Sequence, residues 1–372
     1  HRVHNFSAGP SCLPIDILKE AQAEMISYQG SGMSFMEMSH RDAGGPVQNT
    51  ISSATRAITE LLQVPDNYHV LFFHGGAHGQ FAAGLPMNLA YESGKIDFVN
   101  CGAWSQKAMG EAAKYADVKV CGEFTSGVTP ASEWTYREDA GYIHVCLNET
   151  ISGIEILKEP ELPNGSPVLV ADATSTLFSR PIDVKKYGCI YASAGKNFGP
   201  AGVCIVIVRD DLLKRKPSPY LPGILDLREA ANSKPIPSIY NTPACFQIYM
   251  VDKVLRRVLS LGGLPEMERR AIARSHKIYD TIDASNGFYV NTVDPESRSR
   301  MNICFSIGGD DKERLESLFV EQSEKAGMFQ LFKHPQYGGL RITIYNGLED
   351  DAVNCVNEYL VAFATTHGAS FK

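Results

Sequence analysis

Short apolar runs alternate with longer stretches of mixed polarity between residues 65 and 210. The runs are YHVLFFHGG, KIDFVN, ADVKVC, YIHVCLNE, PVLVADAT, GCIYAS and GVCIVIVR. Nearly continuous hydrophobicity is typical of strands that are covered on both faces. Between two of these runs, residues 103–115 repeat Ala and Met at helical spacing. The alternation predicts an α/β large domain with three layers around a mainly parallel, seven-stranded sheet.

The pattern changes after the Pro-rich segment 216–243. Two long helices are predicted over residues 243–261 and 265–284, followed by a strand at 300–307 and a charged helix within 310–327. A strand within 339–347 and a last helix from residue 349 complete the chain. This order predicts a smaller α+β C-terminal domain. We place the boundary inside the first long helix, so that residues 15–255 form the large cofactor-binding domain and 256–372 the small one, with residues 1–14 packed near the small domain.

The composition is that of a globular protein, with 372 residues of which 44% are hydrophobic and 21% are charged. The 35 basic residues are scattered among 42 acidic ones, which argues against a nucleic-acid partner. No apolar run approaches the roughly 20 residues that cross a bilayer, and the first residues lack the order of a signal peptide. We therefore expect a cytoplasmic enzyme without a membrane partner, and an organellar leader removed before His1 stays an open alternative.

Most of the nine cysteines lie inside apolar runs, with no CxxC pair and no His-spaced cluster. This pattern predicts buried, reduced thiols and neither disulfides nor a metal site.

Polar residues follow several predicted strands, and in an open α/β sheet ligands bind outside the carboxyl ends of the strands. One such segment is GGAHGQF at residues 75–81, where small residues precede a helical stretch. Its backbone N–H groups could approach a phosphate at the helix N-terminus. On this motif alone an ordinary glycine turn is the preferred interpretation.

Asp172 and Lys196 follow consecutive strands and suggest a cofactor. A carboxylate at the end of the buried run PVLVA needs a cationic partner, and a pyridinium nitrogen would serve; a helix-capping Asp is an equal alternative. Lys196 lies in a Gly- and Pro-rich loop, where desolvation favours a neutral amine that can form a Schiff base. A structural lysine is the alternative there. Trp104 could stack on a flat ring and Thr150 could offer a hydroxyl, with core packing and a plain turn as their alternatives.

A set of longer motifs carries a family resemblance. They are NFSAGPSCLP, MSHRDAGG, GGAHGQF, NETISG, VADATSTLFSRPIDVKKYG, GKNFGPAG, IYNTPACFQIY and GGLRITIYN. Over essentially its whole length the chain is similar to the class V aminotransferases of the fold-type I pyridoxal-phosphate enzymes, in the branch that forms phosphoserine. The resemblance implies pyridoxal 5'-phosphate as cofactor and transfer of the amino group of glutamate to 3-phosphohydroxypyruvate, giving O-phosphoserine and 2-oxoglutarate in serine biosynthesis. It also implies a homodimer with shared active sites.

The resemblance implies a role for each residue of the motifs. The cofactor contacts would be a Schiff base with the catalytic Lys196, ring-nitrogen pairing by Asp172, stacking by Trp104, a bond from Thr150 to the phenolic oxygen, and phosphate contacts from Ala77 and His78. Asn241 and Thr242 would complete the phosphate site from the neighbouring subunit. The substrate contacts would be Arg341 on the α-carboxylate, and His40, Arg41 and His334 around the substrate phosphate. Arginine suits such oxygens because its planar fork donates in pairs, although solvated loop charges would be preferred without the family.

Three features depart from the usual family pattern. Gly195 stands where many relatives have Gln, so a polar cofactor contact is lost or supplied by the backbone. His78 stands where some relatives have Arg, and it would add phosphate affinity only when protonated. The stretch AAGLPMNL is one residue longer than the usual form. Another class V reaction, such as a serine–glyoxylate transaminase or a cysteine desulfurase, and a non-catalytic dimeric scaffold are the remaining hypotheses.

Overall fold

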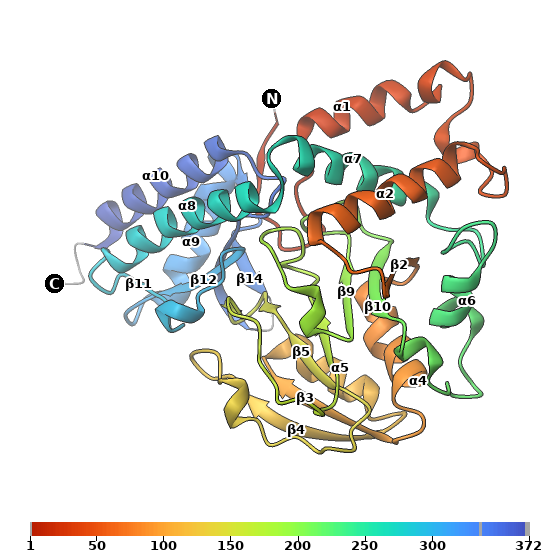
Figure 1. Cartoon of the computed structure of the whole chain (residues 1–372). Helices are drawn as coiled ribbons and strands as arrows, with labels where there is room; N and C mark the ends of the chain where they lie inside the picture. The colour runs from red at the N-terminus through yellow and green to blue at the C-terminus, as the bar shows by residue number, and fades with distance from the viewer. Residues whose placement is uncertain (1, 335–336, 369–372) are drawn as a thin grey trace.

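A seven-stranded sheet forms the centre of the large domain in the computed structural model, which describes residues 2–334 and 337–368, without the side chains of residues 333 and 334 (Figure 1). The strand order is β2-β10-β9-β8-β5-β3-β4. The strands are β2 Tyr68–Phe73, β3 Lys95–Asn100, β4 Asp117–Glu123, β5 Ile143–Cys146, β8 Leu169–Asp172, β9 Cys189–Ser193 and β10 Cys204–Arg209. Only β10 runs antiparallel to its neighbours, β9 and β2. The predicted seven-stranded, mainly parallel sheet is confirmed.

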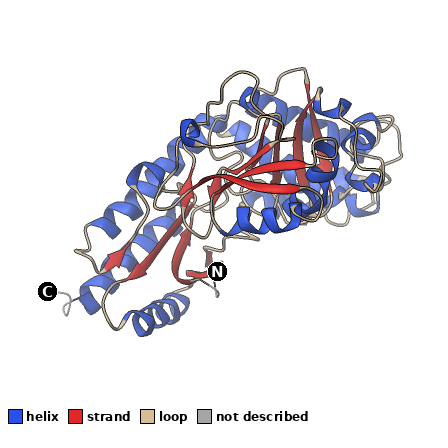
Figure 2. Ribbon diagram, turned by 90° about the horizontal axis from the view of Figure 1, so that it is seen from below, coloured by secondary structure: helices blue, strands red, loops and turns tan. Residues whose placement is uncertain are grey.

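Alternate residues of each strand enter different cores, which explains why the strands read as continuous apolar runs. In β2, Val70 and Phe72 belong to one hydrophobic cluster, whereas Leu71 and Phe73 belong to another. The first cluster includes residues of helices α1 (Ile15–Glu24), α2 (Pro46–Leu62) and α7 (Cys245–Ser260). The second includes residues of α4 (Leu85–Leu89), α5 (Ala103–Ala112) and α6 (Leu227–Asn232). Helices therefore cover both faces of the sheet, which gives the predicted three layers (Figure 2).

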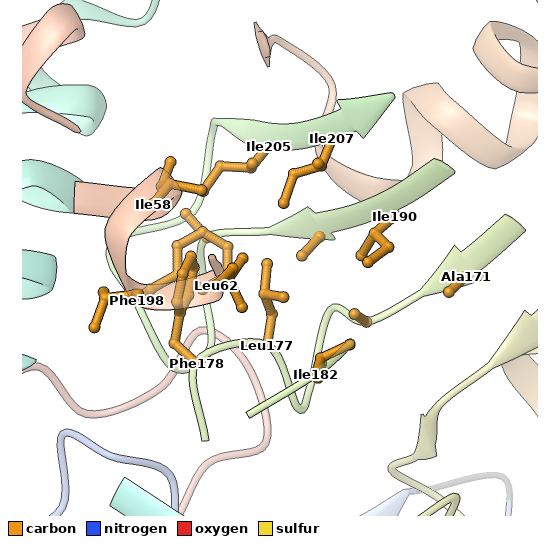
Figure 3. Packing of buried hydrophobic residues seen from close by; sticks show 14 of the residues in the cluster. Ile58, Leu62, Ala171, Leu177, Phe178, Ile182, Ile190, Phe198, Ile205 and Ile207 are labelled. Atoms are coloured by element: carbon orange, nitrogen blue, oxygen red, sulfur yellow. The ribbon is translucent and has the colours of Figure 1, made fainter. Parts of the chain in front are cut away.

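The first cluster is packed between helix α2 and the middle strands. Ile58 and Leu62 of α2 lie over Ile205 and Ile207 of β10, next to Phe178 and Phe198 (Figure 3). Burying one such side chain contributes about 1.5–3 kcal/mol. This packing fixes the central strands, whose carboxyl ends carry the site described below.

A smaller antiparallel sheet of order β11-β12-β15-β14 forms the C-terminal part. Its strands are β11 Tyr289–Val290, β12 Asn302–Ile307, β14 Phe332–His334 and β15 Gly338–Thr343, and its core includes residues of helices α8 Gly263–Asp283, α9 Lys312–Lys325 and α10 Asp350–His367. The smaller α+β unit is confirmed. Near the N-terminus, β1 (His4–Asn5) pairs in parallel with β13 (Met328–Phe329), and Phe6 is buried in the same core. A domain boundary at residue 255 would lie inside α7 and stays a prediction.

Short elements complete the described chain. Strands β6 (Asn148–Glu149) and β7 (Ile154–Glu155) pair with each other. Short 3-10 turns occupy Tyr28–Gly30, Phe35–Glu37, Ala131–Glu133, Val184–Lys186, Leu212–Lys214, Gly223–Leu225 and Pro295–Ser297. None of the helices in the described ranges has the length and apolar character needed to span a membrane.

The helix after β2 is irregular. It begins as α3 (Gly76–Gly79), widens into a π-helical turn over Gln80–Gly84 and continues as α4. A π-helical turn accommodates one extra residue within an α-helix, and Pro86 favours it because proline cannot donate a backbone hydrogen bond. The turn overlaps the stretch AAGLPMNL, which we interpret as one residue longer than usual. The extra length stays a prediction, and the π-helical turn is the place behind the loop at residues 75–78 where one more residue would be accommodated.

No disulfide joins any of the nine cysteines, all of which lie within the described residues. Six of them are buried, Cys12 and Cys245 are half-buried, and Cys355 is exposed. The prediction of buried thiols is wrong for Cys355, which lies on α10 between the inward-facing residues Val353 and Val356 and points to solvent.

Candidate active site

A cavity of about 480 Å³ opens at the carboxyl ends of the central strands. Eight of the residues predicted from the sequence line it: Ala77, His78, Trp104, Thr150, Asp172, Gly195, Lys196 and Arg341. They come from loops after β2, β3, β5, β8 and β9 and from β15 of the small sheet. Residues that are far apart in the chain, from Ala77 to Arg341, thus meet around one space.

Asp172 ends β8 and is 7% exposed. Its Oδ1 accepts the backbone N–H of Thr174 at 2.9 Å. Burial raises the pKa of Asp172, while the bonds from Thr174 and the charge of Lys196 lower it. No ion pair joins Asp172 to a side chain in the part of the chain that the structure describes. The carboxylate is therefore available to a cationic group inside the cavity.

Lys196 lies in the loop between β9 and β10, and the N-terminal segment holds this loop. The backbone N–H of Ser11 donates to the carbonyl of Gly195 at 3.0 Å, and the Ser11 hydroxyl donates to the carbonyl of Lys196 at 2.5 Å. Gly9 lies so close that a Cβ there would be 3.2 Å from Cε of Lys196. Nζ of Lys196 is 5.8 Å from the centroid of the Trp104 ring. The amine is thus directed into the cavity beside an aromatic wall.

Two buried hydrogen-bonding residues fix that wall. Nε1 of Trp104 donates to Oγ1 of Thr150 at 3.0 Å. Glu149 is 1% exposed, and its carboxylate accepts the backbone N–H of Trp104 at 2.9 Å and that of Ile151 at 3.1 Å. Burial raises the pKa of Glu149 to about 7, although these two N–H bonds and the charge of Lys196 oppose the increase. Glu149 braces the backbones beside both Trp104 and Thr150.

The loop after β2 forms a narrow cradle. Gly75 and Gly76 have φ of 86° and 60°, and a Cβ on Gly76 would come within 3.1 Å of Oγ of Ser193. Because these two glycines have no side chains and lead into the first turn of α3, an anion has room to approach the backbone N–H groups of the loop. Burial, and then the charge of Lys107, lower the pKa of His78. Without a bound anion, these two effects favour the neutral form of the His78 imidazole.

Arg341 reaches the cavity from β15 of the small sheet. Its Nη1 donates to the carbonyl of Thr150 at 2.9 Å, and its own backbone N–H donates to Leu331 at 2.8 Å. The planar guanidinium of an arginine is a donor group that suits a carboxylate.

Four other predicted site residues, His40, Arg41, Asn241 and Thr242, are not among the described residues that line the cavity. His40 is buried, and burial followed by the charge of Arg41 lowers its pKa. Arg41, Asn241 and Thr242 are exposed. The carbonyl of Thr242 lies 2.9 Å from Nε2 of a histidine at the end of β2, His74, so this loop is anchored near the cradle. The backbone of His334 belongs to β14, and its side chain lies outside the described residues.

Several cavity residues were not predicted from the sequence. They are Ser7–Pro10, Asn148, Ser175, Ser193 and Gln330, with Glu149 behind the wall. Glu149 stands within the motif NETISG, and Ser193 is the last residue of the predicted strand GCIYAS, but neither was assigned to the site. Residues 7–10 carry the pattern SAGP, whose Gly and Pro suggest a close backbone approach but not its target.

An open α/β sheet with a lysine, a buried carboxylate and an aromatic wall at its carboxyl edge defines the class of enzymes that hold a planar, phosphorylated cofactor. The family model Aminotransferase class-V matches residues 3–325. A phosphoserine aminotransferase of Laribacter hongkongensis is 42% identical over 370 residues, which cover 98% of this chain and 99% of the relative. Among solved structures, the phosphoserine aminotransferase of Bacillus circulans subsp. alkalophilus is 38% identical, with a TM-score of 0.92 and coverage of 98% and 99%. The PLP-bound enzyme of Trichomonas vaginalis is 35% identical, with a TM-score of 0.89 and coverage of 97% and 100%. The chain belongs to the class V aminotransferase family.

Proposed function

We propose that the protein is a pyridoxal-phosphate-dependent enzyme of serine biosynthesis. It transfers the amino group of glutamate to 3-phosphohydroxypyruvate, forming O-phosphoserine and 2-oxoglutarate. The observation that carries this proposal is the presence of Asp172, Lys196 and Trp104 around one cavity. Relatives that share 35–42% of their residues with the chain over nearly its full length are phosphoserine aminotransferases. We also place the reaction in the cytoplasm, which fractionation of the source cells tests.

The residues of the cavity fit pyridoxal phosphate. The buried Asp172 carboxylate lacks an ion-pair partner within the described chain, and a protonated ring nitrogen is a suitable one. The indole of Trp104 offers a flat surface for the ring, and Thr150 offers an oxygen for its phenolic group. The cradle at Gly75, Gly76 and His78 would receive the phosphate.

Pyridoxal phosphate supplies a carbonyl carbon that takes up the amino group and a ring that accepts the electron pair left when the Cα–H bond breaks. The chain itself supplies binding and proton transfer. Lys196 would hold the carbonyl carbon of the cofactor. Once a substrate amine takes the place of Lys196 there, the released Nζ would take the proton from the substrate Cα and deliver it to the former carbonyl carbon of the cofactor. Asp172 would keep the ring nitrogen protonated, and Arg341 would hold the substrate carboxylate beside Nζ.

The keto acid substrate carries both a carboxylate and a phosphate, so its site needs several cationic or hydrogen-bond-donating groups. Among the described residues that line the cavity, Lys196 and Arg341 are the cationic side chains. We propose a homodimer with shared active sites, in which Asn241 and Thr242 contact the cofactor phosphate of the neighbouring subunit. In the same proposal His40, Arg41 and His334 surround the substrate phosphate. The exposure of Arg41, Asn241 and Thr242 in the single chain supports a role across a subunit boundary.

A spectroscopic half-reaction tests the cofactor and the amino donor together. The purified protein should absorb in the visible range with pyridoxal phosphate, and addition of glutamate alone should abolish that band with release of 2-oxoglutarate. The Lys196→Ala variant should show neither the lysine-dependent band nor turnover. A wild-type protein that stays colourless with excess cofactor would instead favour the non-catalytic scaffold.

Competition between phosphorylated and unphosphorylated keto acids tests the substrate. We expect kcat/KM for phosphohydroxypyruvate to exceed that for hydroxypyruvate by at least about a hundredfold, since two or more charge-assisted bonds are each worth about 1.5–3 kcal/mol. Equal values would contradict the phosphate role of Arg41 and His334 and favour another class V transamination.

Mixed dimers test the shared site. Lys196→Ala and Arg41→Ala protomers, each inactive alone, are mixed after reversible dissociation. If Arg41 serves the neighbour's site, half of the randomly formed dimers contain one intact site, and about a quarter of wild-type activity returns. If Arg41 serves its own site, every site keeps a defect and no activity returns.

A further inference from the structure

A buried network of hydrogen bonds joins the small sheet to the large domain beside the cavity. Asn302 on β12 is fully buried, and its Oδ1 accepts Nδ2 of Asn148 on β6 at 2.8 Å. The same Nδ2 donates to Oγ of Ser175, also at 2.8 Å. Oδ1 of Asn148 accepts the hydroxyl of Ser299 at 2.6 Å. Asn148 and Ser175 line the cavity, and the chemistry described above gives none of these four side chains a role.

The direction of each bond follows from Ser299. Its hydroxyl oxygen accepts the backbone N–H of Met301 at 3.1 Å and that of Asn302 at 2.9 Å, so its single hydrogen is left for Oδ1 of Asn148. The amide nitrogen of Asn148 therefore faces Asn302 and meets the oxygen of the second amide. The nitrogen of Asn302 then points the other way, toward β15.

Asn302 extends the network to the strand that holds Arg341. Its Nδ2 donates to Oγ1 of Thr343 at 3.1 Å and to the hydroxyl of Tyr345 at 3.3 Å. Asn302 and Thr343 are register partners in β12 and β15. Arg341 lies two residues before Thr343 and therefore on the same face of the strand. The bond to Thr343 thus holds the part of β15 from which Arg341 reaches the cavity.

The network also reaches the loop of Lys196 and closes a ring. The backbone N–H of Asn346, the residue after the tyrosine, donates to Oδ1 of Asn197 at 3.1 Å. Nδ2 of Asn197 donates to the carbonyl of Ser175 at 3.3 Å. Ser175 lies three residues after Asp172, and Asn197 is the neighbour of Lys196. Hydrogen bonds therefore connect the small sheet to the loops that carry both residues.

We propose that Asn302 is a positioning residue that fixes the small sheet, and thereby Arg341, relative to Lys196. The inference rests on the proposed function, in which Arg341 holds the substrate carboxylate beside Nζ of Lys196. Removal of one member of a buried network leaves its partners unpaired, so neighbouring groups shift to find new ones. Because Asn302 belongs to the small sheet and Asn148 to the large domain, such a shift changes the distance between Arg341 and Lys196.

The Asn302→Ala variant tests the proposal, with Asn291→Ala as matched control. Nδ2 of Asn291 donates to the carbonyl of Cys304 in the same strand at 2.6 Å, and its Oδ1 accepts the backbone N–H of Val293 at 3.0 Å. These bonds of the control residue stay within the small unit. The quantity measured is kcat/KM for the conversion of the holoenzyme by glutamate in single turnovers. We expect it to fall about tenfold in Asn302→Ala, because displacement of a substrate-holding group slows the reaction, and to stay within about twofold of wild type in Asn291→Ala.

A double-mutant cycle with Arg341→Ala separates positioning from general damage. If Asn302 acts through Arg341, its substitution has little left to change once the guanidinium is absent. The double variant should then be within about twofold of Arg341→Ala alone. If Asn302 only supports stability, its effect of about tenfold should appear in both backgrounds, and that result overturns the proposal.

Hydrogen exchange of the cofactor-free protein gives a second readout, which does not depend on turnover. In Asn302→Ala we expect faster amide exchange in β15 and also in residues 173–178 and 194–199, because the ring of hydrogen bonds joins these segments. In Asn291→Ala the faster exchange should be confined to the small unit. If exchange in Asn302→Ala increases around β12 but in neither of the two loops, the ring does not couple the small sheet to them, and the proposal is overturned.

A milder variant covers the case in which Asn302→Ala does not fold. Tyr345→Phe keeps the ring and removes one hydroxyl, which accepts from Asn302 at 3.3 Å and donates to the carbonyl of Ala8 at 3.2 Å. We expect kcat/KM for glutamate to fall about threefold, with the loss absent in the Arg341→Ala background. An unchanged value, or the same loss in both backgrounds, overturns the proposal.

The wild-type protein distinguishes failure of this inference from failure of the proposed function. A wild-type holoenzyme that glutamate does not convert would overturn the proposed function, and the inference with it. A wild type that glutamate converts, together with additive effects of Asn302→Ala and Arg341→Ala, would overturn the inference alone.

Discussion

Replacing Glu149 with Gln alters the brace behind the aromatic wall in two ways. The two oxygens of the carboxylate accept the backbone N–H groups of Trp104 and Ile151. A glutamine has only one oxygen, so its NH₂ group would face one of these N–H donors. The substitution therefore removes one hydrogen bond, and it also removes a buried group that titrates.

The magnitude follows from the pKa of Glu149, which burial raises from 4.5 to about 7. The folded state holds this proton more tightly than the unfolded chain, so the stability that the proton contributes is complete below pH 4.5 and is lost as the pH rises through 7. Between pH 5 and pH 8 the loss in the free energy of unfolding is about 2–3 kcal/mol. Glutamine does not titrate, so the variant avoids this loss. With an unfolding entropy of about 2.1 cal/mol/K per residue, the difference corresponds to about 3 °C in Tm.

Thermal unfolding of the cofactor-free proteins measures this effect. Wild type and Glu149→Gln are compared at pH 5 and pH 8 and at equal protein concentration, since association shifts Tm. We expect the Tm of the variant, relative to wild type, to rise by about 3 °C between the two pH values. The pKa of Asp172 is also raised by burial, but Asp172 is present in both proteins and its contribution largely cancels. A Gln at the exposed Glu60 serves as control. If the difference in Tm between variant and wild type is the same at both pH values, Glu149 does not carry a raised pKa and the reasoning fails.

Three further substitutions test the geometry of the cavity. Trp104→Phe keeps an aromatic ring but loses the 3.0 Å bond to Thr150, and we expect cofactor affinity, measured by equilibrium titration, to fall about fivefold; unchanged affinity would argue against stacking by the indole. Gly76→Ala places a Cβ on a residue with φ of 60°. We expect this change to lower the free energy of unfolding by about 1–2 kcal/mol and to speed release of the cofactor, which calorimetry and release kinetics would detect. Gly195→Ala brings a Cβ to 3.3 Å from Ala201, its nearest neighbour, so the Tm of the variant should stay within about 2 °C of wild type, and a larger decrease would mean that the Lys196 loop cannot adjust.

The large sheet could be predicted from the sequence because both faces of its strands are buried. Runs such as YHVLFF supply alternate residues to two cores, so nearly every position has to be apolar. A helix or a strand with one face in solvent does not need an apolar residue at every position. The direction of β10 could not be predicted, because the apolar pattern of a strand is the same in either direction. The two N-terminal helices on one face of the sheet were also missed, although the 17 residues of α2 contain apolar residues at helical spacing.

The residues at strand ends could be predicted because the carboxyl ends of parallel strands meet at one edge. Asp172 and Lys196 were found in this way. Ser11 and Gly9 were not assigned to the site, because they reach Lys196 from 185 and more residues away, and no local pattern encodes such a contact. Glu149 was missed for a related reason, since its role depends on the position of Trp104 in another loop.

The π-helical turn over Gln80–Gly84 has a consequence for the way in which the chain tolerates changes of length. A helix that widens locally keeps its first turn in place, so a residue added behind Gly76 and His78 does not displace the cradle that they form. The added residue instead shifts the rotation of everything that follows, beginning with Leu85. Homologues whose helix is one residue longer or shorter here can therefore share the same cradle geometry while the helix surface behind it differs. A change in the length of this segment then leaves the chemistry of the site unchanged.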